Sequence, residues 1–150
     1  MRPTSLYISR KVINHQDITK WMKQVGFISS IDPTLFHVTL ANETAKLCWN
    51  DIPKNYSGML EIDNINRKLS SFDNNAIVLE ISSEKLENRW NELQNNGIRW
   101  KWDNYKPHVT LTYSCPDNLE QIIPYDGPII LGSEIFNENR GCQEYKEFIL

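Results

Sequence analysis

Two segments carry apolar residues at the spacing of an amphipathic helix. The first lies between Ser9 and Gly26, and its apolar positions recur three or four residues apart: Ile18, Trp21, Met22 and Val25. Asp17 or Asn14 can cap the start of such a helix, and Gly26 can end it. The pattern therefore predicts a helix with one buried face in this part of the chain.

The second segment lies between Ser82 and Gly97 and has the same design. Ser83 is a suitable N-cap residue, and Gly97 is a suitable stop. Its buried stripe is expected to consist of Leu86, Trp90 and Leu93. The sequence thus predicts two helices of similar length, one in each half of the chain.

Short apolar runs outside these segments predict β-strands. The expected strands are Leu6-Tyr7-Ile8, Gly58–Ile62, Asn75–Ser82, Gly127–Leu131, the long segment Ile129–Asn137, and an edge strand within Tyr145–Leu150. The chain outside the two helices should therefore be rich in β-structure.

The two halves of the chain repeat one pattern. The tetrapeptide His37-Val38-Thr39-Leu40 returns as His108-Val109-Thr110-Leu111, 71 residues later (108 − 37 = 71). The same offset carries Leu6-Tyr7-Ile8 onto Ile77-Val78-Leu79 and Gly26 onto Gly97. A period of this length can occur only twice here, which excludes a long repeat array.

We therefore expect an α+β fold of two similar lobes, each an antiparallel sheet with a helix on its outer face. The lobes would be related by a pseudo-two-fold axis around a central cleft. Residues 1–150 would form a single bilobal domain, because 150 residues with 40% hydrophobic side chains suit one core.

Each repeated tetrapeptide places its His and Thr side chains on one face of its strand. Residues i and i+2 of a strand point to the same side, so His37 lies with Thr39, and His108 with Thr110. Two such strands side by side would offer two imidazoles and two hydroxyls. One imidazole can accept a proton from a nucleophile and the other can donate one to a leaving oxygen, while the hydroxyls hold phosphate oxygens. This set suits chemistry on a phosphodiester.

The charge of the chain limits its ligands. A net charge of −3 argues against a protein that binds long nucleic acids, because such proteins rely on a basic face. A small anion remains possible where a few cations meet. The candidate cations are Arg10, Lys11 and Lys106.

Metal and disulfide chemistry are not indicated. The three cysteines Cys48, Cys115 and Cys142 are an odd number without CxxC spacing, which favours reduced thiols. The histidines lack metal-ligand spacing, and His15, which has no repeat partner, is expected at the surface. We therefore expect no metal and no cofactor.

No apolar stretch is as long as that of a signal peptide or a membrane helix. We therefore expect a cytoplasmic protein without membrane contact. The residues indicate no oligomeric state.

The paired His-x-Thr motifs, on central strands of two similar lobes, resemble the 2H phosphoesterase superfamily. Its members act on 2′,3′-cyclic phosphates, oligoadenylates and cyclic oligonucleotides without metal. More narrowly, the segments Pro3–Lys11, Trp100–Thr110 and Leu131–Phe136 are similar to the bacteriophage anti-CBASS protein 1 family. Those small enzymes degrade the cyclic di- and trinucleotide signals of a bacterial antiviral system.

The resemblance implies roles for individual residues. It assigns the acid/base pair and the phosphate ligands to His37, Thr39, His108 and Thr110. Tyr7 would stack on a nucleobase or hydrogen-bond to it, and Glu134 would accept from an exocyclic amine. Phe72 is a further candidate for stacking, whereas core packing is favoured for Trp100 and Trp102.

The implied activity is a metal-independent phosphodiesterase that hydrolyses 3′–5′-linked cyclic di- or trinucleotide second messengers. It would counter CBASS defence in the cytoplasm of a bacterial host if a phage encodes the chain. One alternative is a 2H phosphodiesterase for 2′,3′-cyclic-ended RNA or 2′–5′ oligoadenylates, for which a longer basic track would be expected. Another is a cyclic-nucleotide sponge, which needs neither acid nor base. Which histidine is the base, and whether a 2′-OH or water attacks first, stay open at the level of sequence.

Overall fold

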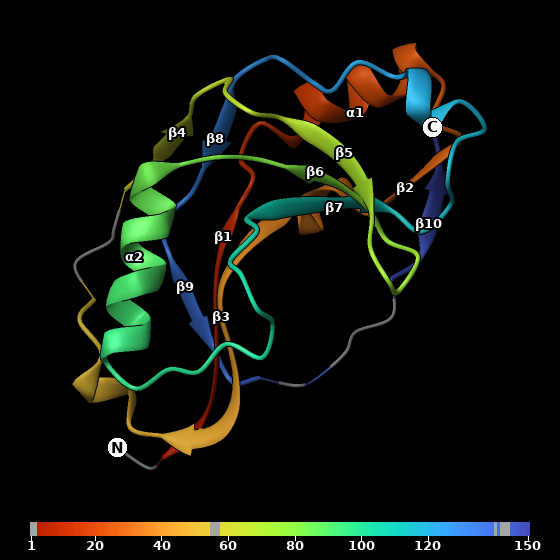
Figure 1. Cartoon of the computed structure of the whole chain (residues 1–150). Coiled ribbons are helices and arrows are strands. Elements are labelled where there is room, and N and C mark those ends of the chain that lie inside the picture. The colour runs from red at the N-terminus through yellow and green to blue at the C-terminus, as the bar shows by residue number, and fades with distance from the viewer. Residues whose placement is uncertain (1–2, 55–57, 140, 142–144) are drawn as a thin grey trace.

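The computed structural model of the chain describes residues 3–54, 58–139, 141 and 145–150 (Figure 1). The strands are β1 (Thr4–Lys11), β2 (Ser29–Ile31), β3 (His37–Leu47), β4 (Leu60–Ile62), β5 (Lys68–Ser71), β6 (Ile77–Glu80), β7 (His108–Thr112), β8 (Ile129–Leu131), β9 (Ile135–Asn137) and β10 (Glu147–Ile149). The helices are α1 (His15–Val25) and α2 (Glu84–Asn95), and short 3-10 turns lie at η1 (Pro33–Leu35), η2 (Trp49–Asp51) and η3 (Leu119–Gln121).

The first predicted helix is confirmed as α1, which buries Ile18 and Met22. It ends at Gly26, whose φ of 105° lies in the left-handed region that glycine adopts without strain. Asn14 is the residue before the helix, but its side chain does not cap the backbone. Its amide donates instead to the carbonyl of Pro128, 2.7 Å away, and so ties the start of α1 to a distant loop.

The second predicted helix is confirmed as α2, and Ser83 caps it by accepting a 3.2 Å hydrogen bond from the backbone N–H of Leu86. Leu86 and Leu93 are buried, as expected from the stripe, and Trp90 is half-buried. Arg89 is also buried on this face. A charged residue in a buried stripe needs partners, and those are described below.

The sheets are antiparallel, which confirms the predicted α+β class. Two have three strands, in the orders β3-β1-β9 and β5-β6-β7, and two have two strands, β10-β2 and β4-β8. The segment expected as one long strand is split into β8 and β9, which belong to different sheets. Strands β2 and β5 were not expected, whereas β10 lies within the predicted edge strand.

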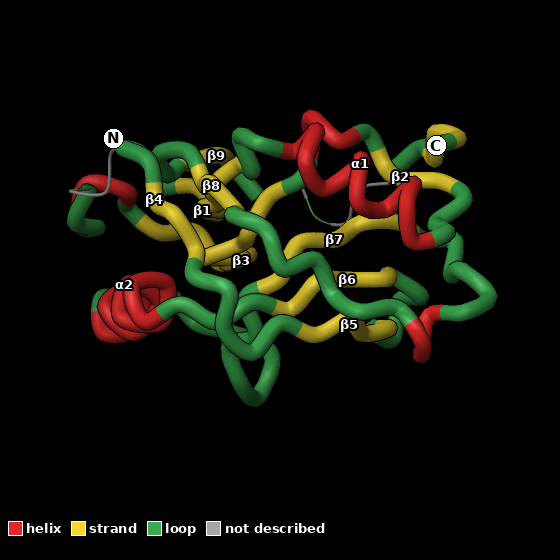
Figure 2. The backbone as a smooth tube through the Cα atoms, turned by 90° about the horizontal axis from the view of Figure 1, so that it is seen from above, coloured by secondary structure: helices red, strands yellow, loops and turns green. Residues whose placement is uncertain are grey.

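Each helix contacts the other half of the chain. Helix α2 packs against β3 of the first half, and the ring of Trp21 in α1 lies 5.8 Å from that of Tyr125 in the second. Figure 2 shows α2 and β4 toward one end of the molecule, and α1, β2 and the C-terminus toward the other. The repeat predicted a helix for each half, but the two halves interlock.

The two motif strands lie together at the centre. Strands β3 and β7 contact each other, and both contribute apolar side chains to the core: Val38, Leu40, Val109 and Leu111. Because side chains alternate along a strand, burial of these positions turns the intervening His and Thr residues away from the core.

Candidate active site

The first motif lies on β3, and the register with β1 fixes its neighbours. Ser9 is opposite Thr39, and Lys11 is opposite His37. Since residues two apart on a strand share a face, Tyr7 joins this group. One face of the sheet therefore carries an imidazole, two small hydroxyls, a phenol and an ammonium.

The second motif lies on β7, where β6 supplies the neighbours. Val78 is opposite Thr110, and Glu80 is opposite His108. The hydroxyl of Ser70 on β5 donates to the Glu80 carboxylate. The two motifs thus differ in charge, with a lysine beside His37 and a glutamate beside His108.

Both imidazoles are oriented in the same way. Nδ1 of His37 lies 2.8 Å from the carbonyl oxygen of Leu35, and Nδ1 of His108 lies 2.7 Å from that of Lys106. A carbonyl can only accept, so Nδ1 carries the proton in each ring. In the neutral state each Nε2 atom therefore carries a lone pair, which at His37 faces the hydroxyl of Tyr7.

An aromatic ring lies against each imidazole. The Tyr7 hydroxyl is 2.9 Å from Nε2 of His37 and 2.5 Å from Oγ1 of Thr39, and its ring centroid is 6.1 Å from that of the imidazole. Phe72 contacts His108 edge-on at 4.7 Å. Tyr7 and Phe72 thus lie beside the motifs, and their contact with a base stays a prediction.

The environment lowers the pKa of both histidines. Burial lowers the pKa of His37, and the Lys11 ammonium lowers it further, against the opposing bond to Leu35. Burial also lowers the pKa of His108, as does the charge of His37, while Glu80 opposes the shift. The two imidazoles lie on β3 and β7, which contact each other. Burial raises the pKa of Tyr7 to about 12, so its hydroxyl stays protonated near neutral pH.

Glu134 lies between β8 and β9 and binds an arginine. Its two carboxylate oxygens accept from Nε and Nη2 of Arg89, at 3.0 and 2.9 Å. The side chains are 2% and 3% exposed. Arg89 also pairs with Glu92 and donates to the carbonyl of Pro53 at 2.7 Å. The base-contact role of Glu134 stays a prediction, but its carboxylate is firmly held.

Arg89 was not predicted from the sequence, although the helical pattern indicates that it is buried. Arg89 lies three residues after Leu86 and four before Leu93, so the helical stripe that predicted their burial passes through it. A buried arginine at such a position requires a carboxylate partner from elsewhere in the chain.

The three candidate cations lie in different places. Arg10 is buried and donates to the carbonyls of Gly58 and Gly132, so it acts within the framework. Lys11 lies on the His37 face, whereas Lys106 is exposed. Among these, Lys11 is the cation that the register brings to the first motif.

The tryptophans before the second motif form an aromatic cluster. Trp100 is half-buried and contacts the ring of Trp102 at 4.9 Å. Core packing was the wrong prediction for Trp102, which lies in the loop before β7 and is 51% exposed. Tyr105, which the sequence reasoning also missed, stacks on Trp90 at 5.4 Å and 5°.

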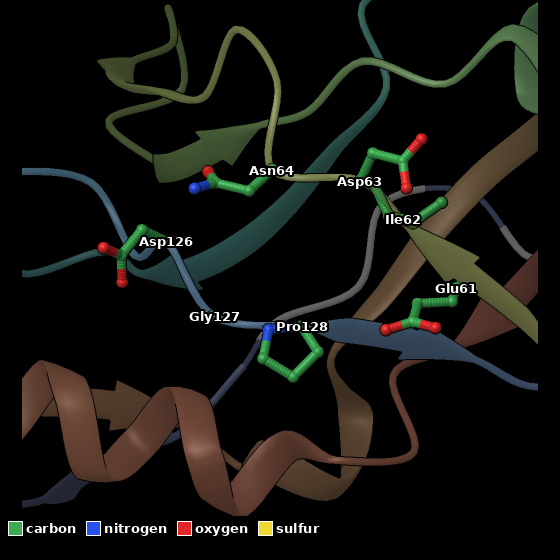
Figure 3. Close-up of a pocket in the computed structure, with 7 residues that line it drawn as sticks. All are labelled: Glu61, Ile62, Asp63, Asn64, Asp126, Gly127 and Pro128. Carbon is green, nitrogen blue, oxygen red and sulfur yellow. The ribbon is translucent and has the colours of Figure 1, made fainter.

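Two cavities are lined by neither the histidines nor the threonines of the motifs. One of about 370 Å³ is lined by Glu61, Ile62, Asp63, Asn64, Asp126, Gly127 and Pro128, and its carboxylates point in different directions (Figure 3). The other, of about 270 Å³, lies beside α2 and is lined by Arg10, Leu40, Leu60, Lys85, Leu86, Asn88, Arg89 and Glu134. No group of three or more His, Cys, Asp or Glu side chains in the described parts of the chain could hold a metal ion.

Cys48 and Cys115 are free thiols, and Cys142 lies outside the described residues. Within residues 3–54, 58–139, 141 and 145–150, neither helix has the length and apolar character needed to span a bilayer.

Comparison with known proteins places the chain in one family. The model of the family described as "Anti-CBASS protein Acb1" matches residues 4–140. A protein of that name from Caulobacter sp. (strain RHG1) is 32% identical over 147 residues, and one from Sphingomonas paeninsulae is 28% identical over 144. These alignments cover 94% and 91% of this chain but 23% of each relative, so the chain spans about a quarter of their length. A further relative, from Escherichia phage RB16, is 46% identical over 39 residues, 26% of this chain and 22% of that protein.

Solved structures share the fold. Escherichia coli LigT complexed with ATP superposes with a TM-score of 0.60 at 15% identity, covering 100% of this chain and 99% of that one. LigT complexed with 3′-AMP gives 0.57 at 14% identity, with coverage of 99% and 98%. A structure described as a phosphoesterase gives 0.58 at 16% identity, also with 99% and 98%.

Proposed function

Because the chain belongs to the anti-CBASS protein Acb1 family, we propose that it is a metal-independent phosphodiesterase for 3′–5′-linked cyclic di- or trinucleotide messengers. Cleavage of these signals in the cytoplasm of the bacterial host would counter CBASS defence. The observation that carries the proposal is the pair of imidazoles, each with Nδ1 bonded to a carbonyl and each with a threonine on the same strand face. The LigT structures with ATP and 3′-AMP support a small nucleotide as the ligand of this fold.

We propose that His37 is the general base and His108 the general acid. A base must be neutral before it acts, and Lys11 beside His37 disfavours its protonated form. An acid must be protonated, and Glu80 beside His108 favours that form. The charge difference between two otherwise equivalent motifs supports this assignment of roles, which the repeat alone left open.

The reaction follows from these assignments. Nε2 of His37 takes the proton of a ribose 2′-OH or of water, and the oxygen attacks phosphorus. As this P–O bond forms, the P–O bond to the leaving ribose oxygen breaks, and His108 gives that oxygen its Nε2 proton. The Thr39 and Thr110 hydroxyls donate to the non-bridging oxygens, where negative charge is held. A 2′,3′-cyclic phosphate formed in this way would be opened by water with the two imidazoles in exchanged roles.

Tyr7 and Glu134 are proposed substrate contacts. The Tyr7 hydroxyl already bridges His37 and Thr39, so a bound ligand would meet it next to the first motif. Each oxygen of the Glu134 carboxylate has a further lone pair beside the one that accepts from Arg89. Glu134 also lines the cavity beside α2, so that lone pair would accept from the exocyclic amine of a nucleobase that enters this cavity.

The test is product analysis. The purified chain is incubated with cyclic di- and trinucleotides, 2′,3′-cyclic-ended RNA and 2′–5′ oligoadenylates, with and without EDTA, and products are identified by mass. We expect linear products from the cyclic substrates at rates that EDTA leaves unchanged, because two imidazoles supply both proton transfers. Binding without any change of mass would identify a sponge, and turnover confined to linear RNA ends would identify the other enzyme class. Loss of activity in EDTA with recovery on added Zn²⁺ or Mg²⁺ would contradict the mechanism.

A further inference from the structure

Two tyrosines stack where the second motif strand ends. Tyr113 follows β7 directly, and Tyr145 precedes β10. Their ring centroids are 6.0 Å apart and the rings are nearly parallel, at 17°. Both residues are half-buried, so part of the stack is open to a ligand.

The stack is anchored by β10. The Glu147 carboxylate accepts from the hydroxyls of Thr112 and Ser29, the latter at 2.9 Å, and from the backbone N–H of Tyr113 at 3.4 Å. Strand β10 also pairs in register with β2, with Glu147 opposite Ile31. Glu147 therefore joins the end of β7, next to Tyr113, to the strand that follows Tyr145.

The stack belongs to the same site as the motifs. The chain leaves β9 at Asn137, which is opposite Tyr7 in the sheet of the first motif. Further along, Tyr145 lies at the end of the second motif strand. Tyr113 directly follows β7, the strand that carries His108 and Thr110, and β7 contacts β3, the strand that carries His37 and Thr39. Tyr7 in turn bonds to His37 and Thr39.

We propose that Tyr113 and Tyr145 form a stacking wall that binds one nucleobase of the substrate. An aromatic wall beside a phosphodiester site suits a ligand whose bases flank the scissile bond, since every base offers a π-face. This proposal rests on the proposed function and extends it to substrate selection. The wall would make the protein select ligands by the size of the stacked base. A purine stacks over a larger area than a pyrimidine and should gain more from the wall.

The experiment measures binding without turnover. Cyclic di-AMP and cyclic di-UMP are titrated by calorimetry into His108→Ala protein, alone and combined with Tyr145→Ala, Tyr145→Phe or Phe148→Ala. We expect Tyr145→Ala to weaken cyclic di-AMP binding about tenfold and cyclic di-UMP binding less. Tyr145→Phe keeps the ring and should retain the affinity. Phe148→Ala is the matched control, because this ring of β10 is 49% exposed and takes no part in the stack.

A second measurement needs no alanine at Tyr145, so it remains informative if Tyr145→Ala does not fold. In 3-fluorotyrosine-labelled His108→Ala protein, the ¹⁹F resonances of Tyr113 and Tyr145, assigned by Phe substitution, should shift when cyclic di-AMP binds. Equal affinities for all combined variants, or unmoved Tyr113 and Tyr145 resonances in ligand-saturated protein, would overturn the wall while leaving the phosphodiesterase intact. A protein that neither binds nor cuts any cyclic nucleotide would overturn the proposed function itself.

Discussion

The hydroxyl of Tyr105 donates a 2.7 Å hydrogen bond to the backbone carbonyl of Thr39. Tyr105 lies three residues before His108, so the loop that leads into the second motif also holds the strand of the first. Stacking on Trp90 fixes the Tyr105 ring, and burial raises the pKa of its phenol, which therefore stays a donor. We regard Tyr105 as a positioning residue that acts through Thr39.

Tyr105→Phe should lower kcat about tenfold with little change in KM. The substitution leaves the Thr39 carbonyl without this donor, which costs about 1–3 kcal/mol, and frees the strand that carries the Thr39 hydroxyl. Tyr125→Phe is the matched control, since the Tyr125 hydroxyl also donates to a carbonyl, that of Pro128 at 2.9 Å, away from the motifs. Steady-state kinetics and thermal unfolding compare the two. Equal loss of kcat in both variants would reduce Tyr105 to a structural role.

His37→Ala and His108→Ala should each remove most turnover. A positioned acid or base contributes about 10²–10⁴-fold, and two groups that act as a unit are not additive. The double variant should therefore be little slower than either single one. His15→Ala is the control, because this histidine lies at the start of α1 and outside both motifs. A near-normal rate in either single variant would exclude the proposed acid/base pair.

The pH–rate profile should shift in opposite ways when the two neighbouring charges are removed. Activity rises with pH as the base His37 loses its proton, and it falls as the acid His108 loses its own. Lys11 lowers the pKa of His37, so Lys11→Met should move the acidic limb to higher pH. Glu80 opposes the lowering of the His108 pKa, so Glu80→Gln should move the alkaline limb to lower pH.

Lys20→Met and Glu84→Gln make the same charge changes on the helices and serve as controls for the pH experiment. Both should leave the limbs in place. If Lys11→Met moved the alkaline limb and Glu80→Gln the acidic one, the assignment of base and acid would have to be reversed.

Arg89→Met should destabilise the fold by about 3–5 kcal/mol, because it leaves the buried Glu134 carboxylate without its partner. Arg99→Met provides the comparison. Arg99 pairs with Glu43 at 3.2 Å, but its side chain is 74% exposed, and an ion pair with such a partner contributes about 1 kcal/mol or less. Urea unfolding at neutral pH measures both, and a similar, small loss in the two variants would refute the importance of the Arg89–Glu134 pair.

The spacing of apolar residues predicted which face of each helix and strand is buried. It did not predict what each buried face packs against. It located both helices, the two motif strands and the side of each strand on which the histidines lie. It could not say which surface a helix packs against, so the contact of α2 with β3 was not foreseen. The pairing of Arg89 with Glu134 and the bond from Tyr105 to Thr39 join residues far apart in sequence, and no local pattern encodes such partners.

The interlocking of the two halves bears on how such a chain could arise and be divided. A fragment ending before residue 72 would retain β3 but lack α2, so the apolar surface that α2 covers would face water. Two copies of one ancestral half could cover this surface by exchanging helices. Gene duplication would then have joined a swapped dimer into one chain, and its two histidines, once identical by symmetry, became free to acquire unequal neighbours.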